Sequence, residues 1–180
     1  MTITKLIRQG EKVELSGRDI RHINNNKVEI AFYHELEKFS DIWHPQLLGV
    51  YNAFALLYEI APQINHWVAV LYHQKMDTIY FYDPYGLEPD EELNFSKYGF
   101  KKELTRLLES SGKKVRYNKV KKQQIKENLN TCGRWCALRL LFRELTNSQF
   151  NDLITSSIKP LTDDELVTSL TLISSLNEHL

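Results

Sequence analysis

Cys132 is the residue in this sequence with the clearest chemical potential, because it stands where a helix is expected to begin. Thr131 is a good N-cap residue, and apolar residues recur at helical spacing over positions 135–142. The start of a buried helix offers unpaired backbone N–H groups and a partial positive charge, which stabilise a thiolate and can hold an oxyanion. Cys132 is therefore a candidate nucleophile. Gly133 beside it would let a substrate backbone come close.

A base and an orienting acid for this thiol are predicted from two apolar runs, residues 66–72 and 78–83. Both runs are rich in β-branched and aromatic residues, and a short polar segment joins them, so they predict a hairpin of buried central strands. His66 opens the first strand and Asp83 closes the second, so antiparallel pairing brings them to the same edge of the sheet. The imidazole could take the Cys132 proton while the carboxylate receives its other N–H. The sequence thus predicts a Cys-His-Asp triad.

Each of these residues also has a structural interpretation when it is taken alone. A cysteine at a helix start is most often a small buried hydrophobe, and an aspartate before a proline is an ordinary turn residue. For Cys136, one turn deeper, we keep the interpretation of a core thiol. A zinc site from Cys132, Cys136 and His66 is disfavoured, because the cysteines have CxxxC spacing and no second Cys/His cluster exists. We therefore predict no metal and no cofactor. Histidines without a comparably placed carboxylate are expected to be structural or exposed: His22, His34, His44, His73 and His179.

Periodicity and turn residues predict the elements that must position this site. Further helices are expected at residues 27–39, 98–108, 147–157 and 162–177, with Asn147 and Thr162 as caps and Pro160 between the last two. Further strands are expected at residues 50–60, closed by Pro62, and at residues 113–120, after a helix stop at 110–112. Residues 1–15 predict a strand or an ordered arm, 16–19 a helix start or turn, and the passage around Trp43 an irregular segment with an anchor or cleft wall. The predicted fold class is α+β, with a central mixed sheet flanked by helices.

Composition places this chain among ordinary globular proteins. Its 180 residues suit one domain, residues 1–180, and the charges balance, with Lys+Arg 23 against Asp+Glu 23. Whole-molecule attraction to nucleic acid or to an anionic membrane is therefore not indicated. The two cysteines suit a reducing compartment, and neither a signal peptide nor a membrane-spanning run is recognised. An intracellular, non-secreted protein is expected.

The motifs around these residues resemble a known family. His66-Trp67, the later Asp83, a glutamine before the nucleophile and the run 131–133 are similar to the cysteine proteases that unite adenovirus maturation protease (adenain) with the SUMO-specific proteases. The resemblance covers about residues 50 to 145. The runs 81–86 and 131–136 look most like capsid-maturation proteases of large DNA viruses, virophages and Polinton-type elements.

This resemblance implies a papain-like arrangement in circularly permuted order and a glutamine that assists the oxyanion hole. It also implies that Trp67 walls a narrow groove passable to glycine-like residues, although Trp67 could equally be a core aromatic. Gln123 and Gln124 both lie slightly farther from Cys132 than the family's glutamine, and we favour Gln124 because it is nearer. Asn65 stands where a glycine commonly precedes the His-Trp pair.

The leading hypothesis is a cysteine endopeptidase that processes viral capsid or structural proteins at small, glycine-containing sites, in the host cytoplasm or viral factory and in the virion. A monomer without membrane contact is expected. Alternatives are a deconjugating protease for ubiquitin-like proteins, an acyltransferase on the same triad, or a catalytically silent binding module. The basic run between Lys113 and Lys122 could touch DNA or another polyanion, although such a run is more often a solvated face.

Overall fold

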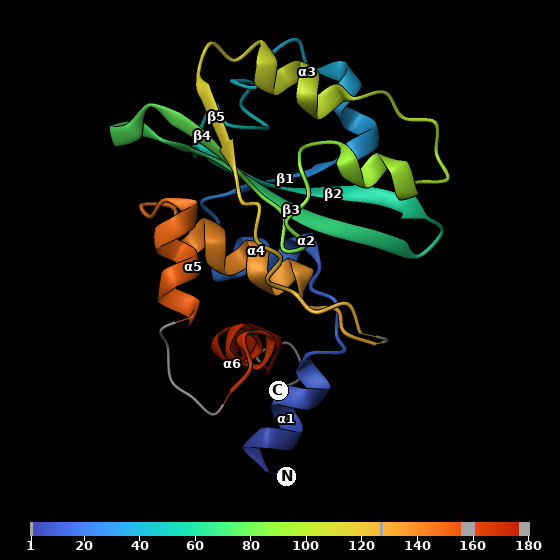
Figure 1. Cartoon of the computed structure of the whole chain (residues 1–180), viewed down its shortest axis with the longest axis vertical. Coiled ribbons are helices and arrows are strands. Elements are labelled where there is room, and N and C mark those ends of the chain that lie inside the picture. Colours follow the sequence, from blue (N-terminus) through green and yellow to red (C-terminus); the bar gives the residue numbers. More distant parts are fainter. Residues whose placement is uncertain (1, 127, 156–160, 177–180) are drawn as a thin grey trace.

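A five-stranded mixed sheet forms the centre of the protein, in the strand order β1-β2-β3-β4-β5 (Figure 1). This computed structural model describes residues 2–126, 128–155 and 161–176, with side chains described as far as residue 172. The strands are β1 (Glu29–Phe32), β2 (Ala53–Ala61), β3 (Ile64–His73), β4 (Thr78–Tyr82) and β5 (Lys114–Tyr117). The predicted α+β class with a mixed sheet and flanking helices is confirmed.

The three central strands form an antiparallel meander, which contains the hairpin that the two apolar runs predict. β2 pairs with β3 and β3 with β4 in antiparallel fashion, whereas β1 and β5 pair in parallel at the two edges. A short 3₁₀ turn, η2 (Gln74–Met76), joins β3 to β4. The hairpin, the strand before Pro62 and the edge strand after residue 112 are therefore all confirmed.

Two apolar layers cover the two faces of the sheet, and β2 contributes to both because successive side chains of a strand point to opposite faces. Ala53, Ala55 and Leu57 pack in the layer that holds α4 (Cys132–Leu141). The alternate residues of β2 pack in the layer that holds α3 (Glu103–Glu109). Figure 1 shows α3 on one side of the sheet and α4 on the other.

The helix after Cys132 is buried on all sides rather than amphipathic. Every residue from 132 to 140 is buried, because α4 lies between β3, α2 (Gly17–Ile23) and α6 (Asp163–Leu176). Its two buried arginines are hydrogen-bonded: Arg134 donates to Thr171 and the Gly10 carbonyl, and Arg139 donates to Asn147. The helix with the candidate nucleophile is thus held rigidly from every direction.

Three sequence predictions are wrong or too long. Residues 1–15 are neither a strand nor an arm but contain α1 (Ile3–Gly10), which packs against α6. Residues 27–39 form no α-helix; they contain β1 and the 3₁₀ helix η1 (Tyr33–Lys38), because pairing with β2 outweighs their helical periodicity. The helix expected at 98–108 is only α3, preceded by the 3₁₀ helix η3 (Glu91–Phe95).

The remaining helices agree with the sequence except at one cap. α2 begins with a capping box at Ser16, and α6 begins after Thr162, whose hydroxyl accepts from the Glu165 N–H. α5 (Asn147–Thr155) is capped by Thr146 rather than by Asn147, because Thr146 exchanges hydrogen bonds with Gln149. Pro160 and the last residues of both predicted C-terminal helices lie outside the described residues. No helix in the described part of the chain is long and apolar enough to cross a membrane.

Candidate active site

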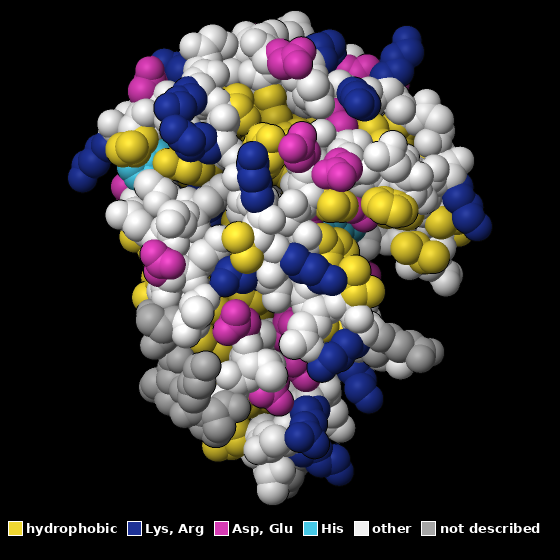
Figure 2. Space-filling model, in the orientation of Figure 1, with side chains coloured by type: hydrophobic (Ala, Val, Ile, Leu, Met, Phe, Trp, Pro, Cys, Tyr) yellow, Lys and Arg dark blue, Asp and Glu magenta, His cyan; other side chains and the backbone are white. Residues whose placement is uncertain are grey.

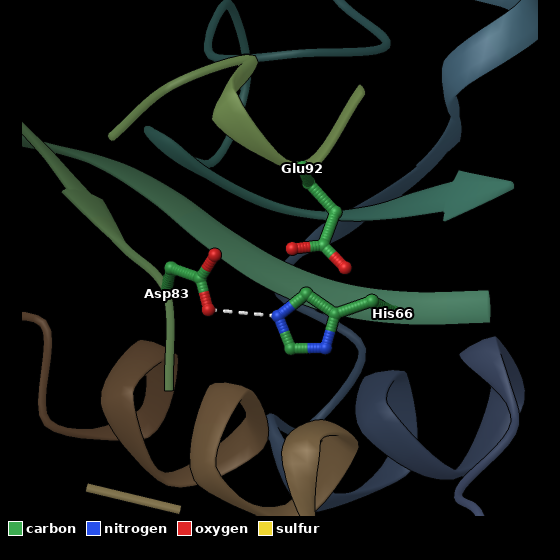
Figure 3. Close-up of side chains that lie close together, drawn as sticks. All are labelled: His66, Asp83 and Glu92. Carbon is green, nitrogen blue, oxygen red and sulfur yellow. Dashed lines mark hydrogen bonds and ion pairs between the residues drawn. The ribbon is translucent and has the colours of Figure 1, made fainter. Parts of the chain in front are cut away.

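His66 and Asp83 lie side by side where the β3–β4 ladder ends. β4 ends opposite Ala69, so Asp83 leaves the ladder beside the part of β3 that contains His66. The His66 Nε2–H donates to Asp83 Oδ1 at 2.7 Å (Figure 3). The two side chains are 3% and 1% exposed, so the pair is almost completely shielded from water. This contact is the one predicted from antiparallel pairing.

Asn118 holds the backbone of Asp83, and the turn after β4 holds its carboxylate. The Asp83 N–H donates to Asn118 Oδ1, and Asn118 Nδ2 donates back to the Asp83 carbonyl oxygen at 2.7 Å. The Tyr85 N–H donates to Asp83 Oδ1, also at 2.7 Å. Tyr85 also stacks on the His66 ring, with 4.4 Å between the ring centroids. Sequence reasoning missed these roles of Asn118 and Tyr85 and predicted only the turn at Pro84.

Cys132 is the first residue of α4 and is 5% exposed. Thr131 precedes it but does not cap the helix; its hydroxyl donates instead to Asp164 Oδ1 at 2.6 Å. The second ring nitrogen of His66 points away from Asp83 and toward the helix below it in Figure 3. The Cys132 thiol interacts with the His66 imidazole, so thiol, imidazole and carboxylate share one buried site at a helix start, which favours negative charge.

The electrostatics of His66 favour its protonated form. Burial lowers the pKa of His66, but the charge and hydrogen bond of Asp83 and the interactions with Cys132 raise it, and the balance leaves the pKa well above its ordinary value. An imidazolium beside a thiol stabilises the thiolate, which is the reactive form of cysteine. The arrangement can therefore support an ion pair between Cys132 and His66.

Cys136 is a core thiol, as expected. It is completely buried, and its Sγ–H donates to the Trp67 carbonyl oxygen at 3.2 Å. Burial raises the pKa of Cys136 well above its ordinary value, and the charges of Cys132 and Asp83 raise it further. Both cysteines are free thiols. Of the two thiols, Cys132 is the one that interacts with His66.

The two candidate glutamines lie in different surroundings. The side chain of Gln124 is exposed and lines a surface hollow with Arg8 and Lys126, so the structure does not bring it to the triad. The side chain of Gln123 is 1% exposed, and its Nε2 lies 3.5 Å from the Tyr85 hydroxyl oxygen. Since Tyr85 stacks on His66, Gln123 is the glutamine whose buried side chain belongs to the site.

Trp67 and Gly133 contact each other in the structure. Trp67 is 2% exposed, and its Nε1–H donates to the Leu15 carbonyl oxygen at 3.0 Å. A Cβ atom on Gly133 would lie 3.1 Å from both Trp67 Cδ1 and Leu15 Cβ. Glycine at position 133 therefore lets α4 approach β3 closely. Trp43, expected to be an anchor or a cleft wall, does not take part in this contact. Its ring packs edge-on against Tyr72, and its Nε1–H donates to the Ser111 carbonyl oxygen.

Segments far from the triad in sequence hold the start of α4. Asp164 in α6 accepts hydrogen bonds from Thr131, from Trp135 Nε1 at 2.9 Å and from the Gln124 N–H at 3.1 Å. The Asn130 N–H donates to the Glu11 carbonyl oxygen at 2.7 Å. Sequence reasoning missed both supports, because neither residue forms part of a local motif.

Glu92 is a further side chain that the sequence did not single out. In sequence it is one member of an acidic loop, but in the structure its carboxyl is 7% exposed and points toward His66 and Asp83 (Figure 3). One ligand-type atom from each of these three residues lies within 4.8 Å of the others. His66 and Asp83 are already hydrogen-bonded to each other, so we assign the group to a hydrogen-bonded site and not to a metal.

The surface beside the site is hollowed. Figure 2 shows a notch at the right-hand edge of the molecule, below the β2–β3 turn of Figure 1. Hydrophobic side chains gather above the notch in this view. Exposed apolar residues on the neighbouring segments are Ile64, Phe95 and Tyr98.

The fold and the site together define an α+β protein with a buried cysteine, histidine and aspartate at the junction of a sheet and a helix start. No family model matches the chain. It is 34% identical over 177 residues to the uncharacterized protein V9 of Sputnik virophage, covering 93% of this chain and 99% of that protein. The chain therefore belongs to the same family as this virophage protein.

Similar solved structures are more distant. The ASFV pS273R protease matches 90% of this chain and 68% of its own, at 14% identity and a TM-score of 0.49. The SUMO protease Ulp1 matches 91% of this chain and 79% of its own, at 12% identity and a TM-score of 0.41. The Chlamydia trachomatis effector Cdu1, solved bound to ubiquitin, matches 98% of this chain and 79% of its own, at 16% identity and a TM-score of 0.43.

Proposed function

We propose that this protein is a cysteine endopeptidase that uses Cys132 as nucleophile, His66 as acid and base, and Asp83 as orienting acid. The observation that carries the proposal is the buried His66–Asp83 hydrogen bond of 2.7 Å, with Cys132 at the start of α4 interacting with the same imidazole. A hydrogen-bonded His–Asp pair that also interacts with a helix-start thiol has the geometry of an activated nucleophile.

In the proposed reaction, the Cys132 thiolate attacks the carbonyl carbon of the scissile peptide bond and forms a C–S bond. The carbonyl oxygen becomes an oxyanion, which N–H groups at the start of α4 and the Gln123 amide would stabilise. The His66 imidazolium then gives its proton to the leaving amine as the C–N bond breaks. Water, deprotonated by His66, then attacks the thioester. The C–S bond breaks, the acid product leaves, and the Cys132 thiolate and the His66 imidazolium are restored. Asp83 holds the ring orientation throughout.

Gln123 replaces Gln124 in this proposal because of its burial. Its Nε2 has only two long contacts, 3.5 Å to the Tyr85 hydroxyl and 3.5 Å to the Leu129 carbonyl, so this donor is not strongly committed to either acceptor. A donor of this kind can turn to a developing oxyanion with little loss.

We further propose that the substrate is a viral capsid or other structural protein, cleaved next to small residues. The virophage source of the relative supports a viral substrate. The close packing of Trp67 on Gly133 supports a narrow approach to Cys132 that admits glycine more easily than larger residues. The corresponding site of action would be the viral factory and the virion. The exposed side chains of Lys114 and Arg116 could add a weak polyanion contact.

The test is cleavage of the co-encoded capsid protein, with the new termini read by mass spectrometry. Wild type and Cys136→Ala should cleave, and Cys132→Ala and His66→Ala should not, because nucleophile and base act as a unit. Cleavage by Cys132→Ala would refute the proposal. Turnover of SUMO or ubiquitin conjugates without capsid cleavage would favour a deconjugating protease instead. Acyl transfer without hydrolysis would indicate an acyltransferase, and an unreactive Cys132 a binding module.

A further inference from the structure

Two carboxyl oxygens beside His66 have no hydrogen-bond partner among the described residues. They are Asp83 Oδ2 and Glu92 Oε2, and both atoms are buried. The residues that carry them are 1% and 7% exposed. Figure 3 shows the Glu92 carboxyl, from η3, pointing into the space above the His66 ring and beside Asp83. Buried polar oxygens normally find a partner, so this pair requires an explanation.

The surrounding charges allow only one of the two carboxyls to ionise easily. Glu92 is faced by His66 from β3, by Asp83 and Tyr85 from the turn after β4, and by Glu91 from its own element. One imidazolium cannot neutralise two buried carboxylates, and like charges this close disfavour double ionisation.

The hydrogen bonds decide which carboxyl holds the charge. Asp83 Oδ1 accepts from His66 Nε2 and from the Tyr85 N–H, whereas the structure gives Glu92 Oε2 no donor. Donors stabilise a carboxylate, so the negative charge belongs on Asp83 and the proton on Glu92. In agreement, burial raises the pKa of Glu92, the His66 charge lowers it, and the charges of Asp83 and Glu91 raise it again.

We propose that Glu92 is a positioning residue that carries a proton, donates it in a hydrogen bond toward Asp83 Oδ2, and serves as a reserve counter-ion for His66. The ligand-type atoms of the three residues lie within 4.8 Å of one another, a span that one bridging water or a small side-chain rotation closes. This inference rests on the proposed function of Cys132 and His66.

Two consequences follow for the thiol. While Glu92 keeps its proton, its hydrogen bond to Asp83 stabilises the Asp83 carboxylate. That hydrogen bond also weakens the electrostatic attraction between Asp83 and the His66 imidazolium. When Glu92 loses its proton at higher pH, or when the Asp83 charge is removed, Glu92 becomes a second anion beside His66 and supports the imidazolium itself. A buried carboxyl with a purely structural role would show neither effect.

The first test measures the rate of Cys132 alkylation by iodoacetamide as a function of pH. Glu92→Gln should move the alkaline inflection, which reports loss of the His66 proton, about one pH unit lower, because the variant cannot supply the second anion. Glu88→Gln, an exposed acid that precedes the same 3₁₀ helix and is not among the charges that act on Glu92, is the matched control and should follow the wild-type profile. Coincident profiles for Glu92→Gln and wild type would overturn the proposal.

The second test is a double-mutant cycle on the alkylation rate, measured well below the ordinary thiol pKa. Asp83→Asn should leave a thiolate that depends on Glu92, so adding Glu92→Gln should slow alkylation about tenfold more than the same change does in wild type. Additive effects would contradict the reserve role. Circular dichroism spectra of each variant establish that only folded proteins are compared.

A third measurement needs no variant. In wild type carrying ¹³C-labelled glutamate, the Glu92 carboxyl resonance, assigned through bonds, should titrate above the ordinary glutamate range; an ordinary titration would overturn the inference. These experiments separate two failures. An unreactive Cys132 would refute the proposed function, whereas a reactive Cys132 that is indifferent to Glu92 would refute only the role of Glu92.

Discussion

Asp164 provides a strong test of how the fold positions the nucleophile. This carboxylate is 3% exposed and reaches from α6 to the start of α4. Oδ1 accepts from Thr131 Oγ1 at 2.6 Å and from Trp135 Nε1 at 2.9 Å, and Oδ2 accepts from the Gln124 N–H at 3.1 Å. One side chain therefore joins the residue before Cys132, the helix that follows it and the segment that carries the glutamines.

The expected cost of Asp164→Asn can be worked from these contacts. Hydrogen bonds to a charged group contribute about 1.5–3 kcal/mol each, and those to a neutral group about 0.5–1.5 kcal/mol. The amide keeps one oxygen for Thr131 and Trp135, with weaker bonds, but places an N–H₂ group opposite the Gln124 N–H. The total loss should be about 3.5–6 kcal/mol, which for a chain of this size lowers Tm by roughly 7–24 °C.

Thermal unfolding followed by circular dichroism measures this loss, and Cys132 alkylation shows whether the helix start has moved. Asp163→Asn is the matched control, since it changes the same charge one residue earlier and should alter stability by no more than about 0.5 kcal/mol. If Asp164→Asn cost less than about 1 kcal/mol and left the alkylation rate unchanged, our view that α6 fixes the start of α4 would be refuted.

Three further changes have defined outcomes. In a peptide-cleavage assay, Gln123→Ala should lower kcat by roughly 10²–10³ and leave KM unchanged, because one oxyanion donor is lost. Gln124→Ala should leave both constants nearly unchanged. A large loss of kcat in Gln124→Ala and not in Gln123→Ala would assign the oxyanion donor to Gln124. Gly86→Ala should destabilise the turn after β4, because φ is +74° and the new Cβ would lie 2.9 Å from the Lys121 nitrogen; an unchanged urea midpoint would contradict this. Burial raises the pKa of Glu92, so wild type should lose stability as pH rises from about 4.3 to the folded-state pKa; Glu92→Gln should lack this loss, and parallel stability curves would argue against it.

The sequence predicts the centre of the fold and of the site well, because these parts rest on local patterns. Residues 66–72 and 78–83 are dense in β-branched and aromatic residues, which suits strands covered on both faces. Antiparallel pairing then dictates the meeting of His66 with Asp83 without any knowledge of the rest of the chain. The helix start at Cys132 follows from a similarly local signal.

The failures occur where distant partners decide. α1 has apolar residues at helical spacing, but the helix is only eight residues long, it buries only Ile7 and Gly10, and its packing partner is α6 at the other end of the sequence. Residues 27–39 have apolar spacing that suits a helix, but four of them pair with the edge of β2 and form β1. Glu92 looks like a solvated acid, because burial of a single carboxyl cannot be read from neighbouring residue types.

The supports of α4 also set the order in which activity can arise during synthesis. The Asn130 side chain donates to the Lys12 carbonyl across 118 positions of sequence, and Asp164 reaches back 33 positions to Thr131. Contacts of such long range form late, because the intervening chain must be ordered first. A ribosome-bound chain can hold the complete His66–Asp83 hairpin long before α6 emerges to fix the thiol. On the proposed function, the Cys132 thiol is therefore held in place for reaction only after α6 has been synthesised.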